Sequence, residues 1–189
     1  EILTQEINKL NLINGLLEKE KIILLRKNYF NHIKKNNVKS EYFTDKMPNN
    51  YKWIGYITLA FPEAKILHIE RNSKATCWSN FKTCFLNKGN GFSNKLENLV
   101  EYYLIYKQLI TFWFDNFNSK IYNISYEHFV HDFENQAKNL INYLNLDWEK
   151  KSLTFYKSKR YVSTASFAKV KEKIYSNSSE EWKNYKNFF

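Results

Sequence analysis

The segment that most constrains the fold is a short apolar run that ends in an arginine just before a helical pattern begins. Residues 64–70 form this run, which is typical of a parallel strand covered on both faces. Arg71 follows it, and a helix is predicted to begin at Asn72 or Ser73 and to carry Ser79. A strand that delivers a cation to the start of a helix favours an anion, because unpaired N–H groups and the helix dipole attract negative charge.

The same order of strand and helix recurs further along the chain. Residues 120–125 form a second apolar run that ends at Tyr126 and Glu127, and a long helix is predicted after it. Between the two runs, residues 94–116 place apolar side chains three and four residues apart, which is typical of a helix with one buried stripe. This alternation predicts a helix-rich α/β fold with a parallel sheet, in one domain over the 189 residues. In such sheets, ligands bind beyond the carboxyl ends of the strands.

The remaining elements are predicted from the spacing of apolar residues. Helices are predicted over residues 1–19, 22–36, 50–61 and 180–189, and a short strand over residues 38–44. The short strand would lead into Asp45-Lys46-Met47-Pro48, where the proline suits the first turn of a helix.

Three segments in the central region occur in a fixed order. They are DK-x-P at residues 45–48, FP-x-AKI-x-H-x-x-R ending at Arg71, and a serine eight residues after that arginine. This order resembles sulfotransferases of the tyrosylprotein type and related bacterial enzymes, which use 3′-phosphoadenosine 5′-phosphosulfate (PAPS). The resemblance implies that Arg71 and Ser79 hold the 3′-phosphate of PAPS. It also implies that Lys46 lies near the transferred sulfuryl group, as the catalytic cation.

The resemblance extends over about residues 45–185. The order of strand, Tyr126, Glu127 and helix is similar to the family's arrangement and makes Tyr126 a candidate for donor binding. A T-x-S segment, followed by I-Y and by W-x-x-Y, resembles the family's C-terminal substrate and cofactor loop. The resemblance implies that Ser166 reaches the phosphate region of the donor.

Two positions in the C-terminal region depart from the family's pattern. Lys173 stands where a proline is usual, and Glu181 stands where a basic residue is usual before the tryptophan. The candidates for the missing basic contact are therefore Lys171 and Lys173.

The family's glycine-rich phosphosulfate-binding loop, a relative of the P-loop, has no counterpart among the four glycines. We interpret the sequence as an N-terminally truncated domain of P-loop-like fold, and we expect residues 1–189 alone to be poorly stable and inactive. The family's general base commonly follows that loop, but neither Glu1 nor Glu6 matches well enough to be assigned.

The chain is strongly basic, with a net charge of +10 and a pI of about 9.4. This charge fits either a lysine-rich solvated surface or an anionic partner such as a nucleotide, a nucleic acid or a sulfated polymer. Lysine gives diffuse charge, whereas arginine recognises phosphate in a bidentate manner, so Arg71 at a strand end is the more specific signal. No apolar run reaches the length of about 18–20 residues that a membrane span requires.

The cysteines and histidines indicate neither a disulfide nor a metal. Cys77 and Cys84 lie seven residues apart on one predicted helix, about 10 Å along its axis and too far for a disulfide. Free thiols favour a reducing, cytoplasmic setting. None of the four histidines shows metal-ligand spacing, and His68 is interpreted as a buried core histidine.

The resemblance thus implies metal-independent transfer of a sulfuryl group from PAPS to a hydroxyl or an amine. The acceptor stays open between carbohydrate, peptide and small metabolite, and the oligomeric state is not predicted. One alternative is another P-loop-like enzyme, such as a nucleotide kinase, with Glu70 or Glu127 as a magnesium ligand. The other is a nucleic-acid-binding module, which is disfavoured because the aromatic residues fall on core stripes.

Overall fold

The computed structural model describes residues 2–14, 17–35, 40–83, 85, 89–158 and 172–188. Their contacts divide the chain into two compact units. The first consists of Glu1–Ile66 and Gln108–Ile121, and the second consists of Leu67–Lys107 and Tyr122–Phe189. The prediction of a single domain stays a prediction.

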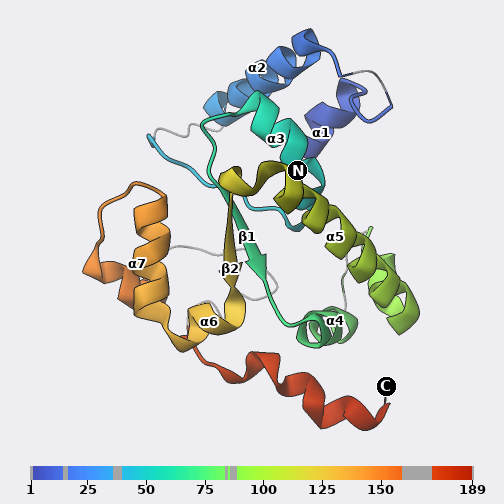
Figure 1. Ribbon diagram of the computed structural model, residues 1–189, viewed down its shortest axis with the longest axis vertical. Helices are drawn as coiled ribbons and strands as arrows, with labels where there is room; N and C mark the ends of the chain where they lie inside the picture. Colours follow the sequence, from blue (N-terminus) through green and yellow to red (C-terminus); the bar gives the residue numbers. More distant parts are fainter. Residues whose placement is uncertain are drawn as a thin grey trace. The chain divides into compact units, whose positions relative to one another are not determined.

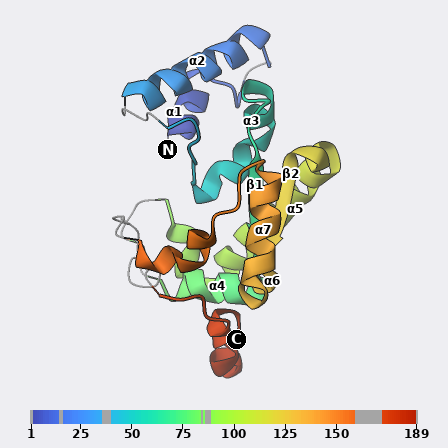
Figure 2. The same ribbon diagram turned by 90° about the vertical axis from the view of Figure 1, so that its left-hand side faces the viewer.

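The first unit is helical (Figure 2). Its elements are α1 (Ile2–Lys9), α2 (Lys19–Lys35), the 3₁₀ helix η1 (Pro48–Trp53), α3 (Ile54–Ala60) and the short η3 (Asn118–Lys120). Pro48 opens η1, as the sequence predicts, because its missing N–H would have no partner in a first turn. The helices share an apolar core formed by Leu3, Ile7, Leu12, Leu25, Tyr29, Ala60 and Phe61.

A tryptophan anchors the C-terminal part of α5 (Leu96–Phe117) in this unit. The indole N–H of Trp113 donates to the carbonyl of Tyr51 at 2.8 Å. Its ring packs over Gly55, where an added Cβ would lie 3.0 Å from the ring edge. A larger residue at this position would have to displace the tryptophan ring by a few tenths of an ångström.

A two-stranded sheet organises the second unit. Strands β1 (Ile66–Glu70) and β2 (Ile121–Ser125) pair side by side and run in the same direction (Figure 1). Helix α4 (Ser73–Phe81) follows β1, and α6 (Tyr126–His131) follows β2. The other elements are η2 (Gly91–Asn94), α7 (Phe133–Tyr143), η4 (Lys150–Lys157), η5 (Asn177–Ser179) and η6 (Glu181–Phe188).

The buried stripe of α5 and the core histidine are confirmed. Leu99 and Ile110 of the stripe are 3% and 1% exposed. His68 is buried, and its ring nitrogens lie 2.7 Å from the side-chain oxygens of Asn123 and Tyr106. Burial lowers the pKa of His68, which keeps the ring neutral inside the unit. A neutral ring suits both contacts, because one nitrogen can donate to Asn123 while the other accepts from Tyr106.

The observed fold is a helix-rich α/β fold with a small parallel sheet, and most predicted helices and both central strands are present. The prediction that β1 is covered on both faces is wrong, because Leu67 and Ile69 are 39% and 63% exposed. The strand predicted over residues 38–44 is wrong where it is described: residues 40–44 form no strand and are exposed. The helix predicted over residues 1–19 ends at Lys9, and Asn11 then adopts a left-handed backbone with φ of 49°. The long helix predicted after β2 is broken at Asp132, whose φ and ψ of −125° and 56° leave the helical region.

Membrane crossing receives no support from the helices that the structure describes. None of them is both long enough and apolar enough to span a bilayer.

Candidate functional site

The end of β1 places a cation beside the start of a helix, as the sequence predicts. Arg71 directly follows the strand, and Asn72 caps α4 by accepting the backbone N–H of Ala75 at 3.0 Å. Asparagine suits this position because its side-chain oxygen satisfies one of the free N–H groups of the first turn. The remaining N–H groups and the helix dipole lie next to Arg71, so the local field favours an anion.

The end of β2 brings an aromatic ring to this arginine. Tyr126 opens α6, and the guanidinium carbon of Arg71 lies 5.1 Å from the centre of its ring. Both residues follow the carboxyl ends of paired parallel strands, where ligands bind in sheets of this kind. The structure therefore brings together two of the candidate donor-binding residues.

A turn from the C-terminal region completes the surroundings of Arg71. We call Asn177–Ser179, which forms η5, the serine turn. Arg71 donates from Nε to the hydroxyl of Ser179 at 3.2 Å and from Nη2 to the carbonyl of Ser178. The hydroxyls of Ser178 and Tyr126 are also hydrogen-bonded, at 2.7 Å. The serine turn thus occupies the Nε–Nη2 edge of the guanidinium, and Nη1 has no hydrogen-bond partner in the described part of the chain.

Glu127 links the serine turn to the start of α4. Its Oε1 accepts the hydroxyl of Ser179 at 2.7 Å and the backbone N–H of Asn72 at 3.0 Å. Burial alone would raise the pKa of Glu127, but the two hydrogen bonds and the charge of Arg71 outweigh it and hold the pKa below its ordinary value. Glu127 is therefore a carboxylate at neutral pH.

Ser79 lies on α4 as predicted, but the structure does not join it to Arg71. Ser79 is half-buried, and its backbone carbonyl accepts the hydroxyl of Thr83 at 2.7 Å. Within the described residues, no hydrogen bond connects Ser79 to Arg71. Its role in donor binding stays a prediction.

Lys46 lies in the first unit, on the exposed segment that leads into η1. The neighbouring Asp45 accepts the hydroxyl of Tyr29 at 2.8 Å and the side-chain amide of Asn50 at 3.3 Å. Among the residues that the structure describes, Lys46 forms no ion pair, either with Asp45 or with another carboxylate. Asp45 therefore fixes the segment, and the ammonium group of Lys46 stays in solvent.

Comparison with known proteins decides the family. A profile described as the sulfotransferase family matches residues 14–150, which is more than half of the chain. The chain belongs to the sulfotransferase family. The matched region includes Lys46, Arg71, Ser79 and Tyr126.

A protein of Aquifex aeolicus (strain VF5), described as an uncharacterized protein, is similar over most of this chain. It is 30% identical over 162 residues, which cover 85% of this chain and 21% of the relative. The chain therefore spans about a fifth of the length of this relative.

The structure describes some of the C-terminal residues that the sequence predicts to contact the donor in this sulfotransferase-family chain. Ser166 and Lys171 lie outside the described residues. Lys173 is described, and its ammonium nitrogen lies 5.8 Å from the centre of the Tyr156 ring. Glu181, which stands where the family usually has a basic residue, forms an ion pair of 2.5 Å with Lys82, next to α4.

Magnesium ligation by Glu70 or Glu127, as in the kinase alternative, would compete with contacts that the structure shows. Glu70 pairs with Lys107 at 2.5 Å, and this hydrogen bond lowers the pKa of Glu70. Glu127 is held by Ser179 and Asn72. Within the described residues, no three side chains of His, Cys, Asp or Glu gather in a way that could hold a metal ion.

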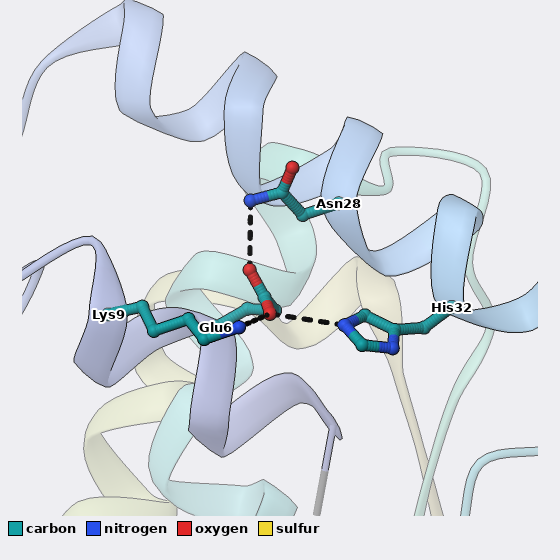
Figure 3. Close-up of polar contacts among 4 residues, drawn as sticks. All are labelled: Glu6, Lys9, Asn28 and His32. Atoms are coloured by element: carbon teal, nitrogen blue, oxygen red, sulfur yellow. Dashed lines mark hydrogen bonds and ion pairs between the residues drawn. The ribbon is translucent and has the colours of Figure 1, made fainter.

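A buried carboxylate in the first unit was not assigned from sequence. Glu6 is 1% exposed and accepts Lys9 Nζ at 2.9 Å and Asn28 Nδ2 at 2.8 Å, while His32 Nε2 lies 3.2 Å away (Figure 3). These contacts tie α1 to α2 beside a small pocket of about 240 Å³. The hydrogen bond from Lys9 contributes most to lowering the pKa of Glu6, against the opposing effect of burial.

Glu6 could have been recognised from the sequence as a residue on a buried face. Leu3 and Leu10 stand three residues before and four residues after it, so Glu6 shares their face of the helical pattern. A carboxylate on such a face requires partners, because an unpaired buried charge is costly. The partners themselves come mainly from α2, and the spacing within α1 could not identify them.

Proposed function

We propose that the chain forms part of a PAPS-dependent sulfotransferase, which transfers the sulfuryl group to a hydroxyl or an amine. Membership of the sulfotransferase family supports the reaction class. The observation that carries the choice of donor is Arg71, held at the end of β1 beside the first turn of α4. This arrangement offers a guanidinium and free backbone N–H groups to one phosphate, as the 3′-phosphate of PAPS requires. In this proposal the sheet belongs to a P-loop-like fold.

The proposed site would act by positioning and by electrostatic stabilisation. The acceptor oxygen or nitrogen attacks the sulfur, the bond from sulfur to the phosphate oxygen breaks, and the 3′,5′-bisphosphate leaves with the bonding electrons. The proton of the acceptor hydroxyl or amine is released to water. Arg71, with Ser79 and Tyr126, would hold the donor's nucleotide, and Lys46 would stabilise the charge that grows on the leaving oxygen. Ser166 and Lys171 are proposed as further phosphate contacts from the C-terminal region.

No metal takes part in this proposal, because Lys46 supplies the positive charge at the leaving group. The acceptor is proposed only as a class: a carbohydrate, a peptide or a small metabolite with a nucleophilic hydroxyl or amine. Acceptor loops vary on a shared scaffold, and the described residues do not favour one of these classes.

The test uses the full natural protein that contains this chain. Titration calorimetry compares 3′-phosphoadenosine 5′-phosphate (PAP) with adenosine 5′-phosphate, which lacks the 3′-phosphate. We expect PAP to bind at least about 10-fold more tightly, because a charge-assisted contact contributes about 1.5–3 kcal/mol. Equal binding of the two nucleotides would contradict the proposal.

A second measurement separates the proposed reaction from phosphoryl transfer. PAPS turnover is followed with and without a magnesium chelator, using ATP as the alternative donor. We expect PAPS to be consumed at the same rate in both conditions and ATP to be inert. Consumption of ATP that stops on chelation would support a kinase instead.

A further inference from the structure

Ser179 lies between Arg71 and Glu127 as a hydrogen-bond relay. Its hydroxyl oxygen accepts the Nε–H of Arg71 at 3.2 Å, and its hydroxyl proton is donated to Oε1 of Glu127 at 2.7 Å. The direction of the relay is fixed, because a guanidinium can only donate and the carboxylate of Glu127 can only accept. Ser179 is 5% exposed, so water does not compete for these bonds.

We propose that Ser179 and Glu127 are positioning residues that aim the guanidinium of Arg71 at an anionic ligand, the 3′-phosphate of a nucleotide donor. This assignment rests on the proposed function. It goes beyond that function because neither residue would touch the donor, and both would act through Arg71.

The geometry determines which edge of the guanidinium is presented. The serine turn holds the Nε–Nη2 edge through Ser179 and the carbonyl of Ser178, and the ring of Tyr126 lies against the group. Within the described residues, the protons that remain without a partner are those of Nη1 and the second proton of Nη2. These form a two-pronged donor that matches two oxygens of a phosphate.

Glu127 fixes the backbone as well as the side chain of the site. The same carboxylate oxygen that receives Ser179 accepts the N–H of Asn72, the residue between Arg71 and α4. Arg71 and the first turn of α4 are thereby held by one anchor. An arginine side chain loses rotamer entropy when it is fixed, so holding it in advance reduces the loss on binding.

The same contacts allow an opposite interpretation, in which the serine turn competes with the ligand for Arg71. In this interpretation the phosphate would bind the Nε–Nη2 edge of the guanidinium, which Ser179 and Ser178 already occupy. The two interpretations predict opposite effects for a variant that loosens the turn. Positioning predicts weaker binding of the 3′-phosphate, whereas competition predicts tighter binding.

The first variant is Ser179→Ala in the full protein, with Ser176→Ala as a matched control on an exposed serine of the same segment. Calorimetry with PAP and with adenosine 5′-phosphate gives the affinity that depends on the 3′-phosphate. We expect Ser179→Ala to lower the affinity for PAP by about 3- to 10-fold, which is the contribution of one hydrogen bond. The affinity for adenosine 5′-phosphate should not change. Ser176→Ala should change neither affinity.

Two variants of Glu127 separate the effect of its hydrogen bonds from the effect of its negative charge. Glu127→Gln keeps an oxygen that can accept from Ser179 and Asn72, whereas Glu127→Ala removes it. We expect Glu127→Gln to bind PAP within about 3-fold of the wild type or more tightly, because it also removes a negative charge near Arg71. Glu127→Ala should lose PAP affinity at least as strongly as Ser179→Ala. Thermal melts confirm that each variant compared is folded.

The outcomes distinguish this inference from the function on which it rests. If the wild type binds PAP and adenosine 5′-phosphate equally, the proposed function fails and the positioning assignment fails with it. If the wild type prefers PAP and Ser179→Ala keeps or increases that preference, only the positioning assignment is overturned. Equal losses for both nucleotides would also overturn it, because they would indicate general loosening of the fold.

Discussion

The guanidinium of Arg71 lies against the ring of Tyr126, with 5.1 Å between the guanidinium carbon and the ring centre. One residue follows β1 and the other follows β2, so the pairing of the two strands creates the contact. A cation over an aromatic face gains about 0.5–1 kcal/mol at an exposed site and more when water is excluded. The contact also restricts Arg71, and a restricted arginine selects one direction of approach for an anion.

The first prediction concerns Arg71 and Ser79 as donor contacts. Arg71→Ala and Ser79→Ala, made in the full protein, should lower the affinity for PAP far more than the affinity for adenosine 5′-phosphate. The expected loss for Arg71→Ala is about 1.5–3 kcal/mol, because a charge-assisted contact is removed. Arg71→Lys should retain only part of the affinity for PAP, since an ammonium cannot form the two-pronged contact. Calorimetry with both nucleotides measures the difference.

A lysine on the surface of α7 is the control for this prediction. Lys138→Ala removes a charge that pairs with Glu134 on the same helix. It should lower both affinities only slightly, through general electrostatics, with PAP affected a little more because it carries more negative charge. An effect of Lys138→Ala as selective as that of Arg71→Ala would show that net charge, and not a site, selects PAP.

The second prediction concerns the buried carboxylate of Glu6. Glu6→Ala should lower the free energy of unfolding by about 1–3 kcal/mol, because Asn28 and Lys9 lose their acceptor at a buried position. Glu6→Gln should cost less, since it keeps an acceptor for one of them. Urea denaturation at pH 7 measures both values. Glu20→Gln, an exposed substitution on α2, is the control and should be nearly neutral.

The stabilising effect of Glu6 should depend on pH with a definite sign. Its folded-state pKa is lowered from the ordinary value of 4.5, so the folded protein binds this proton less readily than the unfolded chain. The stabilisation is therefore complete well above pH 4.5 and is lost as the pH falls below 4.5 through the folded-state pKa. The difference in stability between wild type and Glu6→Gln should shrink between pH 6 and pH 3. A constant difference would contradict this assignment.

The third prediction concerns the buried ring of His68. Its pKa is lowered from 6.5 by burial, so the unfolded chain takes up a proton at a pH where the folded protein does not. Stability should therefore decrease as the pH falls below about 6.5. His68→Gln should remove this dependence while lowering stability at pH 7.5. Urea denaturation of the wild type and the variant at pH 7.5 and 5.5 tests this prediction. If the stability of the variant depends on pH as strongly as that of the wild type, another group causes the dependence.

The elements around the site could be predicted because their signals are local. Apolar runs of strand length, each followed by a helical period, predicted β1, α4 and β2 with Arg71 and Tyr126 at their ends. The errors arose where local patterns have no tertiary support. Tyr42 and Phe43 suggested a strand, but both side chains are exposed and their segment is not paired.

The relay around Arg71 could not be predicted, because its parts come from distant segments. Nothing in the spacing of Ser178 and Ser179 distinguishes them from other polar residues of the C-terminal region. Their role depends on where that region packs, and the structure places η5 and η6 against α4. The sequence suggests Glu127 only as a metal ligand, whereas its observed partners are a hydroxyl and a backbone N–H.

The last prediction concerns Lys46 as the catalytic cation. Lys46→Ala, made in the full protein, should lower the rate of sulfuryl transfer more than it lowers the affinity for PAPS. Negative charge on the bridging oxygen grows as the S–O bond breaks, so a nearby cation interacts more strongly with the transition state than with bound PAPS. The expected loss in rate is about 10²–10³-fold. Lys46→Arg should not restore the full rate, since a planar guanidinium does not replace a compact ammonium.

The competing interpretation is that Lys46 supports the fold by pairing with Asp45. The structure argues against it, because Asp45 is bound by Tyr29 and Asn50, and the described residues contain no ion pair of Lys46. Lys46→Ala should therefore leave the melting temperature unchanged, whereas Asp45→Ala should lower it by removing the acceptor for the hydroxyl of the buried Tyr29. Single-turnover kinetics beside thermal melts separates the two roles. An unchanged transfer rate in a Lys46→Ala protein that melts at a lower temperature would remove Lys46 from the site.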